Sequence, residues 1–545
     1  MTIALDRPAP ARSTAQHRAP RRARLARLAQ RWHRRLGWLG GLALLLFGLS
    51  GLTHPLMTWF GPQAAAFFPP QAQVEETDLT RLPPLLQTLH DDGLERASVI
   101  KLVPTESGQA LQVTPVDQPQ RRYFALDSGA ELNDFDRRQA EWLARYYTGL
   151  TDTPLRELTL QTEFDHAYPE VNRLLPVWKV TFDTDDGRTA FIHTELNALA
   201  SLTNNFRTTQ QGLFRTLHTL SWLDAVEPVR VFAMAALCLA LILMSLTGIA
   251  LVLALPARTL PHGQRRWHRW LALGLWLPLL AFSASGLYHL LHQSAKPALE
   301  GLRYAAPLEL DRLTLAGSTA SMHQSDSPSA HTDHVSPNSP TSPTSPNSPH
   351  NNPAAHLNSV TLLQGPDGAF YFRLGQPNGR PGEAVHHHGR FDGTPIERVS
   401  PLLHVHDQRP AAVDEKTLVR HFAAQHLQID PAAITDLRTV TRFGPEYDFR
   451  NKRLPVWRVQ HADGIAFIDP TNGALVERVA HSDRWEGFSF SHLHKWNFLT
   501  PLTGRELRDG LVATVILAAL AFTGLGFAML VRRRPRTRSV SGVQR

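Results

Sequence analysis

The chain has 545 residues, with 56 Lys and Arg against 48 Asp and Glu, a formal net charge of +8 and a mean hydropathy of −0.22. These averages are those of a soluble protein of several domains, and the basic charge raises the question of nucleic acid. The single cysteine, Cys238, excludes an intrachain disulfide and Cys-based zinc or iron–sulfur sites. Histidine, by contrast, is abundant, with 27 copies.

The apolar residues are concentrated in four uncharged runs. Each run exceeds the ~20 residues that a helix needs to cross a bilayer core of ~30 Å. We therefore predict an α-helical membrane protein with four transmembrane helices and two large α+β outer domains, arranged as a duplicated helix–outer domain–helix. The predicted segments are a cytoplasmic arm at 1–35, helix 36–60, outer domain 61–228, helix 229–257, cytoplasmic loop 258–269, helix 270–295, outer domain 296–508, helix 509–531 and cytoplasmic tail 532–545.

The placement of arginine predicts the orientation. The arm, the loop and the tail together have a net charge of +19, whereas the rest of the chain has −11. Positively charged segments stay in the cytoplasm, so both termini are predicted inside and both outer domains outside, in the periplasm if the membrane is a bacterial inner membrane. The basic arm then reflects orientation and attraction to the lipid bilayer, and no nucleic-acid partner is predicted. A cleaved signal peptide is the less favoured alternative for the first run.

The sequence contains the same pattern twice. The second copy is longer and includes a Ser/Pro/Asn-rich stretch at 318–353 that is predicted to be a disordered linker. In both outer domains, alternating segments predict small antiparallel sheets, with helices over 139–147 and 415–426 packed on them. The matching segments are Arg31–Arg34 with Arg266–Arg269, Ser50–His54 with Ser285–His289, Leu217–His218 with Leu493–His494, Thr247–Gly248 with Thr523–Gly524, and Leu175–Val180 with Leu454–Val459.

Three histidine positions recur in both copies and are the candidate site residues. Ionisable residues near membrane spans usually have a function, and two related copies offer imidazoles in pairs, as bis-histidine haem ligation in a helix bundle requires. Proton relay is the alternative chemistry, and pairing within a copy or across copies stays open. We expect four of these histidines near the outer face and two at the inner face. The outer candidates are His54, His218, His289 and His494, and the inner candidates are His33 and His268.

One face of the first predicted helix is a stripe of small residues. Gly37, Gly41, Gly48 and Gly51 lie at helical spacing between His33 and His54. Such a stripe lets another helix approach closely, which is its more common use, and it also leaves room for a flat macrocycle.

The second outer domain holds a weaker candidate for a metal site. His404 and His406 are alternate residues, which share a face if the segment is a strand, and His386–His388 lie nearby in the sequence. A solvated polar loop is the favoured alternative for this set.

Taken together, the motifs resemble the PepSY-associated transmembrane family and, within it, the haem-containing siderophore-iron reductases of the bacterial inner membrane. The resemblance covers nearly the whole chain. It implies two PepSY-like periplasmic domains and a four-helix bundle that binds haem b, two groups in all, through the histidines above. The residues that carry it are the helix starts Trp32–Gly37 and Trp267–Leu271, the Ser-Gly pairs Ser50–Gly51 and Ser285–Gly286, the Leu-His pairs at 217–218 and 493–494, and the strands around Trp178 and Trp457.

The resemblance also implies an activity, that of a membrane oxidoreductase that reduces ferric siderophore or another ferric chelate in the periplasm. The cytoplasmic segments are too short for a nucleotide- or flavin-binding domain and carry no Gly-x-Gly-x-x-Gly or Walker motif. We therefore expect the electrons to come from membrane quinol or a separate donor protein. Two alternatives remain: a non-catalytic PepSY membrane module that binds a periplasmic partner, and a transporter that uses the histidines as proton or metal relays.

Overall fold

The computed structural model divides into two compact units. The helical unit comprises the described parts of Met1–Gly61, Phe206–Ala298 and Trp485–Arg545, and the β-rich unit those of Pro62–Asn205 and Leu299–Arg484. The predicted linker at 318–353 lies outside the described residues. The structure describes residues 19–71, 73–255, 263–296, 302–313, 357–377, 397–399, 402–444 and 446–531.

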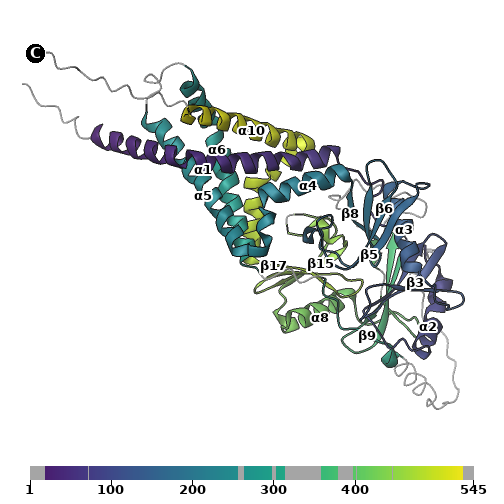
Figure 1. The fold of residues 1–545 in the computed structure, drawn as a ribbon. Coiled ribbons are helices and arrows are strands. Elements are labelled where there is room, and N and C mark those ends of the chain that lie inside the picture. Colours follow the sequence, from purple (N-terminus) through teal and green to yellow (C-terminus); the bar gives the residue numbers. More distant parts are fainter. Residues whose placement is uncertain are drawn as a thin grey trace, which may run out of the picture. The chain divides into compact units, whose positions relative to one another are not determined.

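In the described part of the chain, four long helices form the helical unit, and each is long and apolar enough to cross a membrane. The four predicted apolar helices are thereby confirmed, and they support the prediction of a membrane protein. The helices are α1 (Ala19–Phe60), α5 (Glu227–Ala254), α6 (Gln264–Ser294) and α10 (Thr500–Val531). Both α1 and α6 contact α5 and α10, so the four helices close into a bundle (Figure 1). Apolar side chains from all four form its core, among them Leu44, Leu241, Leu275 and Phe522.

The glycine stripe of α1 faces α10. A Cβ atom at Gly41 would lie 2.4 Å from the ring tip of Phe527, and one at Gly48 would lie 2.9 Å from a methyl carbon of Leu520. Only glycine permits such a close approach without a shift of the neighbour, so the stripe serves helix packing in this structure.

A short helical segment leads into each of α5 and α10. The first is α4 (Asn205–His218), which is followed by the 3₁₀-helix η3 (Ser221–Val226) and then by α5. The second is the π-helix η7 (Phe490–His494), which precedes the 3₁₀-helix η8 (Asn497–Leu499) and α10. Residues 206–228 and 485–508 are predicted to belong to the outer domains. Their contacts place them with the long helices instead.

The β-rich unit contains one four-stranded antiparallel sheet from each copy. Helix α3 (Phe135–Thr148) packs on the first sheet and α8 (Glu415–Leu427) packs on the second, which confirms the two predicted helices. In each copy, the indole of the predicted strand tryptophan donates a hydrogen bond to an acid in the first turn of that helix, from Trp178 to Asp136 at 2.8 Å and from Trp457 to Glu415 at 2.6 Å. The strand order of the first sheet is β5 (Leu155–Gln161), β6 (Val177–Phe182), β7 (Thr189–His193) and β8 (Ala198–Thr203). The strand order of the second sheet is β14 (Asp436–Val440), β15 (Val456–His461), β16 (Gly464–Ile468) and β17 (Leu475–Ala480).

The two copies also share a larger sheet. Strand β2 of the first copy pairs antiparallel with β10 of the second, with Leu102 opposite Val360 and Lys101 opposite Thr361. Helix α2 (Glu76–Asp91) contributes Leu82 to the core beneath this sheet. The strand order of this sheet is β12 (Glu397–Val399), β11 (Phe370–Pro377), β10 (Ser359–Gln364), β2 (Val99–Thr105), β3 (Gly108–Thr114) and β4 (Arg122–Ala125), and β13 (Leu403–His404) also pairs with β11. The short strands β1 (Arg96–Ala97) and β9 (Leu308–Glu309) form a separate two-stranded sheet.

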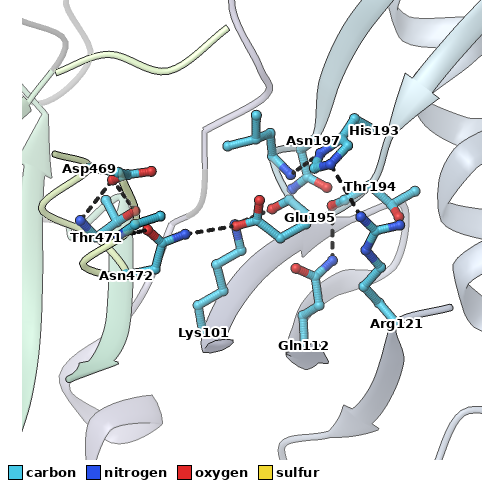
Figure 2. Close-up of polar contacts among 12 residues, drawn as sticks. Lys101, Gln112, Arg121, His193, Thr194, Glu195, Asn197, Asp469, Thr471 and Asn472 are labelled. Carbon is cyan, nitrogen blue, oxygen red and sulfur yellow. Dashed lines mark hydrogen bonds and ion pairs between the residues drawn. The ribbon is translucent and has the colours of Figure 1, made fainter. Parts of the chain in front are cut away.

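A buried ionic cluster lies where turns from the two copies meet. The carboxylate of Glu195 accepts hydrogen bonds from Arg453 at 2.6 Å and from Lys101 at 3.2 Å, and Arg453 also contacts Asp469 at 2.5 Å. Figure 2 shows Glu195 between Lys101 and Asn472. Burial opposes ionisation of Glu195, but the charges of Arg453 and Lys101 outweigh it and hold the pKa of Glu195 below its ordinary value. Since Glu195 comes from the first copy and Arg453 from the second, the cluster ties the copies together.

Candidate functional site

The six candidate histidines all lie in the helical unit. His33 and His54 are on α1, and His268 and His289 are on α6. His218 is the last residue of α4 and His494 the last residue of η7, so each stands just before the helix that completes its copy.

The structure brings four of the six together as two pairs, each with one histidine from each copy. In the first pair, His33 and His268, the ring centroids are 6.3 Å apart and the planes cross at 72°. In the second pair, His218 and His494, the centroids are also 6.3 Å apart and the planes cross at 89°. In both pairs, the ring contact therefore joins one copy to the other.

The two pairs lie at well-separated levels of the bundle. Ser50, which contacts His218, and His33 are both on α1 and are 17 residues apart. At 1.5 Å per helical residue, this spacing corresponds to about 25 Å along the helix.

A hydroxyl group orients the first-copy imidazoles through their Nδ1 atoms. Thr247 Oγ1 lies 3.2 Å from His33 Nδ1, and Ser50 Oγ lies 2.9 Å from His218 Nδ1. Each hydroxyl already donates its hydrogen to a backbone carbonyl of its own helix, at 2.7 Å for Thr247 and 2.6 Å for Ser50. The hydroxyl oxygen must therefore accept from Nδ1–H, which leaves the lone pair on Nε2.

His494 has the same tautomer for a stronger reason. Its Nδ1 lies 3.1 Å from the carbonyl oxygen of Phe282, which only accepts, and 3.3 Å from Ser285 Oγ. A Cβ atom at Gly286 would lie 3.4 Å from His494 Cε1, and Gly248 has the same relation to His33, so each ring packs beside the glycine of its motif. The motifs Thr247-Gly248 and Ser285-Gly286 therefore contact His33 and His494, respectively.

His268 is held differently. Its ring stacks on Phe522 of α10 at 4.3 Å, and Gly526 lies beside its Cε1. Its Nδ1 is buried and has no hydrogen-bond partner among the described residues. Next to it, Arg269 donates hydrogen bonds to the carbonyls of Val252 and Leu255 and so covers the C-terminal end of α5.

The surroundings of the second pair favour the neutral form of both imidazoles. Burial, together with a smaller effect of the neighbouring histidines, lowers the pKa of His218 to about 4 and that of His494 to about 3. A neutral imidazole whose Nδ1 is engaged keeps its lone pair on Nε2, and this is the form that binds a metal ion.

His54 and His289 take no part in these pairs. His289 stacks on Phe490 at 3.9 Å, and its Nδ1 lies 2.5 Å from the carboxylate of Glu486. His54 meets Phe214 edge-on at 6.5 Å. No ring contact joins either one to another histidine in the described part of the chain. Gln210 occupies the position in the first copy that Glu486 has in the second.

The weaker candidates in the β-rich unit do not form a cluster. Strand β13 ends at His404, whose ring packs on Tyr371 at 4.9 Å, whereas His406 lies in the following turn and donates to the carbonyl of Leu313 at 3.2 Å. The premise that both lie on one strand is therefore wrong. His386–His388 lie outside the described residues. Among the residues that are described, no group of three or more His, Cys, Asp or Glu is arranged to hold a metal ion.

Sequence reasoning missed the aromatic residues around the second pair. Phe214 stacks on His218 at 4.6 Å, and Phe490 stacks on His494 at 4.7 Å. Each phenylalanine precedes its histidine by four residues, and the two are separated by the same 276 positions as the histidines. That repeated Phe-x-x-x-His spacing is the signal by which the sequence identifies them.

Comparison with known proteins adds no relative. No protein-family model matches this chain. No curated protein matches its sequence either.

Proposed function

We propose that this protein is a haem b membrane oxidoreductase of the PepSY-associated type. In this proposal it carries electrons through the bacterial inner membrane to ferric siderophore or another ferric chelate in the periplasm. The observation that carries the proposal is the presence of two histidine pairs, each with one histidine from each copy, with the same centroid separation of 6.3 Å.

That separation fits axial ligation of one ion by each pair. With a metal–imidazole bond of about 2.1 Å and a ring nitrogen roughly 1.1 Å from its ring centre, two imidazoles on opposite sides of one ion have centroids about 6.4 Å apart. The donor set fits as well, because haem iron takes neutral imidazole nitrogen, and three of the four Nδ1 atoms are engaged so that Nε2 is free to bind. His33 with His268 and His218 with His494 would hold one haem each.

Bound haem would supply a one-electron couple between ferric and ferrous iron. The chain's own residues orient the ligands, and the separated levels of the two pairs provide successive sites along the bundle. The charge distribution, +19 on the predicted cytoplasmic segments and −11 elsewhere, supports an orientation with the second pair toward the periplasm. The short cytoplasmic segments favour membrane quinol or a separate protein as the electron donor.

Haem content tests the proposal directly. The purified full-length protein is expected to show a Soret band, an α band that sharpens on reduction with dithionite, and two haems per chain. His33→Ala and His218→Ala should each remove one haem, whereas the matched control His492→Ala should remove none, because His492 stacks on Phe488 and no ring contact joins it to another histidine in the described part of the chain. A chain without haem after haem-sufficient growth, or histidine variants with full haem, would contradict it.

Reductase activity is tested separately. Dithionite-reduced protein, freed of excess reductant, is mixed with a ferric hydroxamate or ferric citrate, and ferrous iron is trapped with a chromogenic chelator. Reoxidation of the haem in step with ferrous iron release supports the acceptor class. Haem that stays reduced with both chelates would refute it while leaving the haem assignment intact.

A further inference from the structure

The two imidazoles of the second pair share an orienting contact. Each stacks nearly parallel on the phenyl ring that lies four residues earlier in its own helix. The Phe214–His218 stack has an interplanar angle of 14°, and the Phe490–His494 stack has an angle of 18°. The arrangement occurs in both copies although one helix is α4 and the other is the π-helix η7.

A hydrogen bond at Nδ1 alone leaves an imidazole free to adjust its plane, because its terminal torsion has a broad energy profile. A phenyl ring packed against the face of the imidazole restricts this freedom, because rotation of the imidazole out of its plane breaks the stacked contact. The plane of each imidazole therefore follows the plane of its phenylalanine. The two stacks cross, and the imidazole planes meet at 89°.

The two histidines outside the pairs, His54 and His289, contact these phenyl rings. Phe490 also stacks on His289 at an interplanar angle of 13°, and the carboxylate of Glu486 contacts the Nδ1 of His289. In the first copy, His54 meets Phe214 edge-on. In the first pair, His268 is stacked on Phe522, but no aromatic stack to His33 is found among the described residues.

We infer that Phe214 and Phe490 are positioning residues that hold the axial imidazoles of the second pair perpendicular to each other. The inference rests on the proposed haem function. The angle between axial imidazole planes governs the splitting of the iron d orbitals that lie out of the haem plane. Perpendicular planes leave two of these orbitals nearly equal in energy, whereas parallel planes separate them. The stacks thereby set an electronic property of the bound iron without touching it.

Electron paramagnetic resonance of the ferric full-length protein tests the inference. The His33→Ala background is used so that the second pair is the remaining bis-histidine centre. We expect the highly anisotropic low-spin signal typical of perpendicular imidazoles. Phe214→Leu and Phe490→Leu should retain the low-spin haem but replace this signal with the rhombic signal of planes that have turned toward parallel.

Two controls separate orientation from general packing. Phe488→Leu removes a similar phenyl–histidine stack, 4.2 Å from His492, and should leave the signal unchanged. Phe490→Tyr keeps a stacked ring and should preserve it. If the leucine variants lose haem altogether, a Phe490→Tyr variant that keeps the anisotropic signal still supports the inference. A Phe490→Tyr variant that also loses the signal contradicts it.

The possible failures are distinguishable. A rhombic signal in the parent protein, or an anisotropic signal that persists in both leucine variants, overturns the inference and leaves the proposed function standing. A parent protein without low-spin haem removes the proposed function and the inference together.

Discussion

The Glu195→Gln substitution perturbs the β-rich unit at one of its buried charges. Glu195 and Arg453 are each 1% exposed and 2.6 Å apart, and Lys101 is a second cation on the same carboxylate. Glutamine has the same shape but no charge, so Arg453 and Lys101 would remain buried with less compensation. Removal of one partner of a buried ion pair costs about 3–5 kcal/mol. Because Arg453 keeps its contact with Asp469, we expect the lower end of that range.

Thermal unfolding of the full-length protein in detergent measures this loss. For a unit of this size, each kcal/mol lowers the midpoint by roughly 1–2 °C, so a fall of about 3–6 °C is expected. Asp183→Asn is the matched control. It breaks the Arg156–Asp183 pair, which has a similar distance of 2.7 Å but whose side chains are 62% and 57% exposed, and such surface pairs contribute about 0–1 kcal/mol.

The pH dependence provides a second readout of the same substitution. The folded protein holds the pKa of Glu195 below its ordinary value, so the contribution of this carboxylate is present above pH ~4.5 and is lost as the pH falls further. The unfolding midpoint of Glu195→Gln should therefore fall less on acidification than the midpoint of the parent protein does. A variant with the midpoint and the acid slope of the parent would refute the reasoning.

Two further predictions concern packing in each unit. Gly41→Ala should destabilise the bundle by about 1–3 kcal/mol, because its methyl group would overlap Phe527, whereas Gly274→Ala, with no atom within 4 Å of the added carbon, should not; thermal unfolding in detergent compares them. Trp178→Phe should cost about 1.5–3 kcal/mol, because it removes the indole hydrogen bond to the buried carboxylate of Asp136; the midpoint should fall while the haem spectrum stays unchanged.

The membrane helices and the candidate histidines were accessible from the sequence because both leave local signals. A run of ~20 apolar residues is sufficient to predict a span, whatever surrounds it. The recurrence of His33, His218 and their counterparts needs only a comparison of the chain with itself.

The pairing of the histidines was not accessible in this way. Whether His218 faces His494 or His54 depends on how the four helices close into a bundle, which no local pattern encodes. The same limit applies to the sheet shared by β2 and β10, since its register joins segments more than 250 residues apart. Conversely, alternation alone misplaced His404 and His406, because a turn begins after the first of them.

The β2–β10 pairing has a consequence for how the duplicated chain can be divided. If the two copies were produced as separate polypeptides, each would carry one bare strand edge, from β2 or from β10, and bare edges recruit other strands. Self-association would then compete with reassembly of the native sheet. Because both edges belong to one polypeptide, they pair intramolecularly. The covalent link therefore favours the native sheet over intermolecular association.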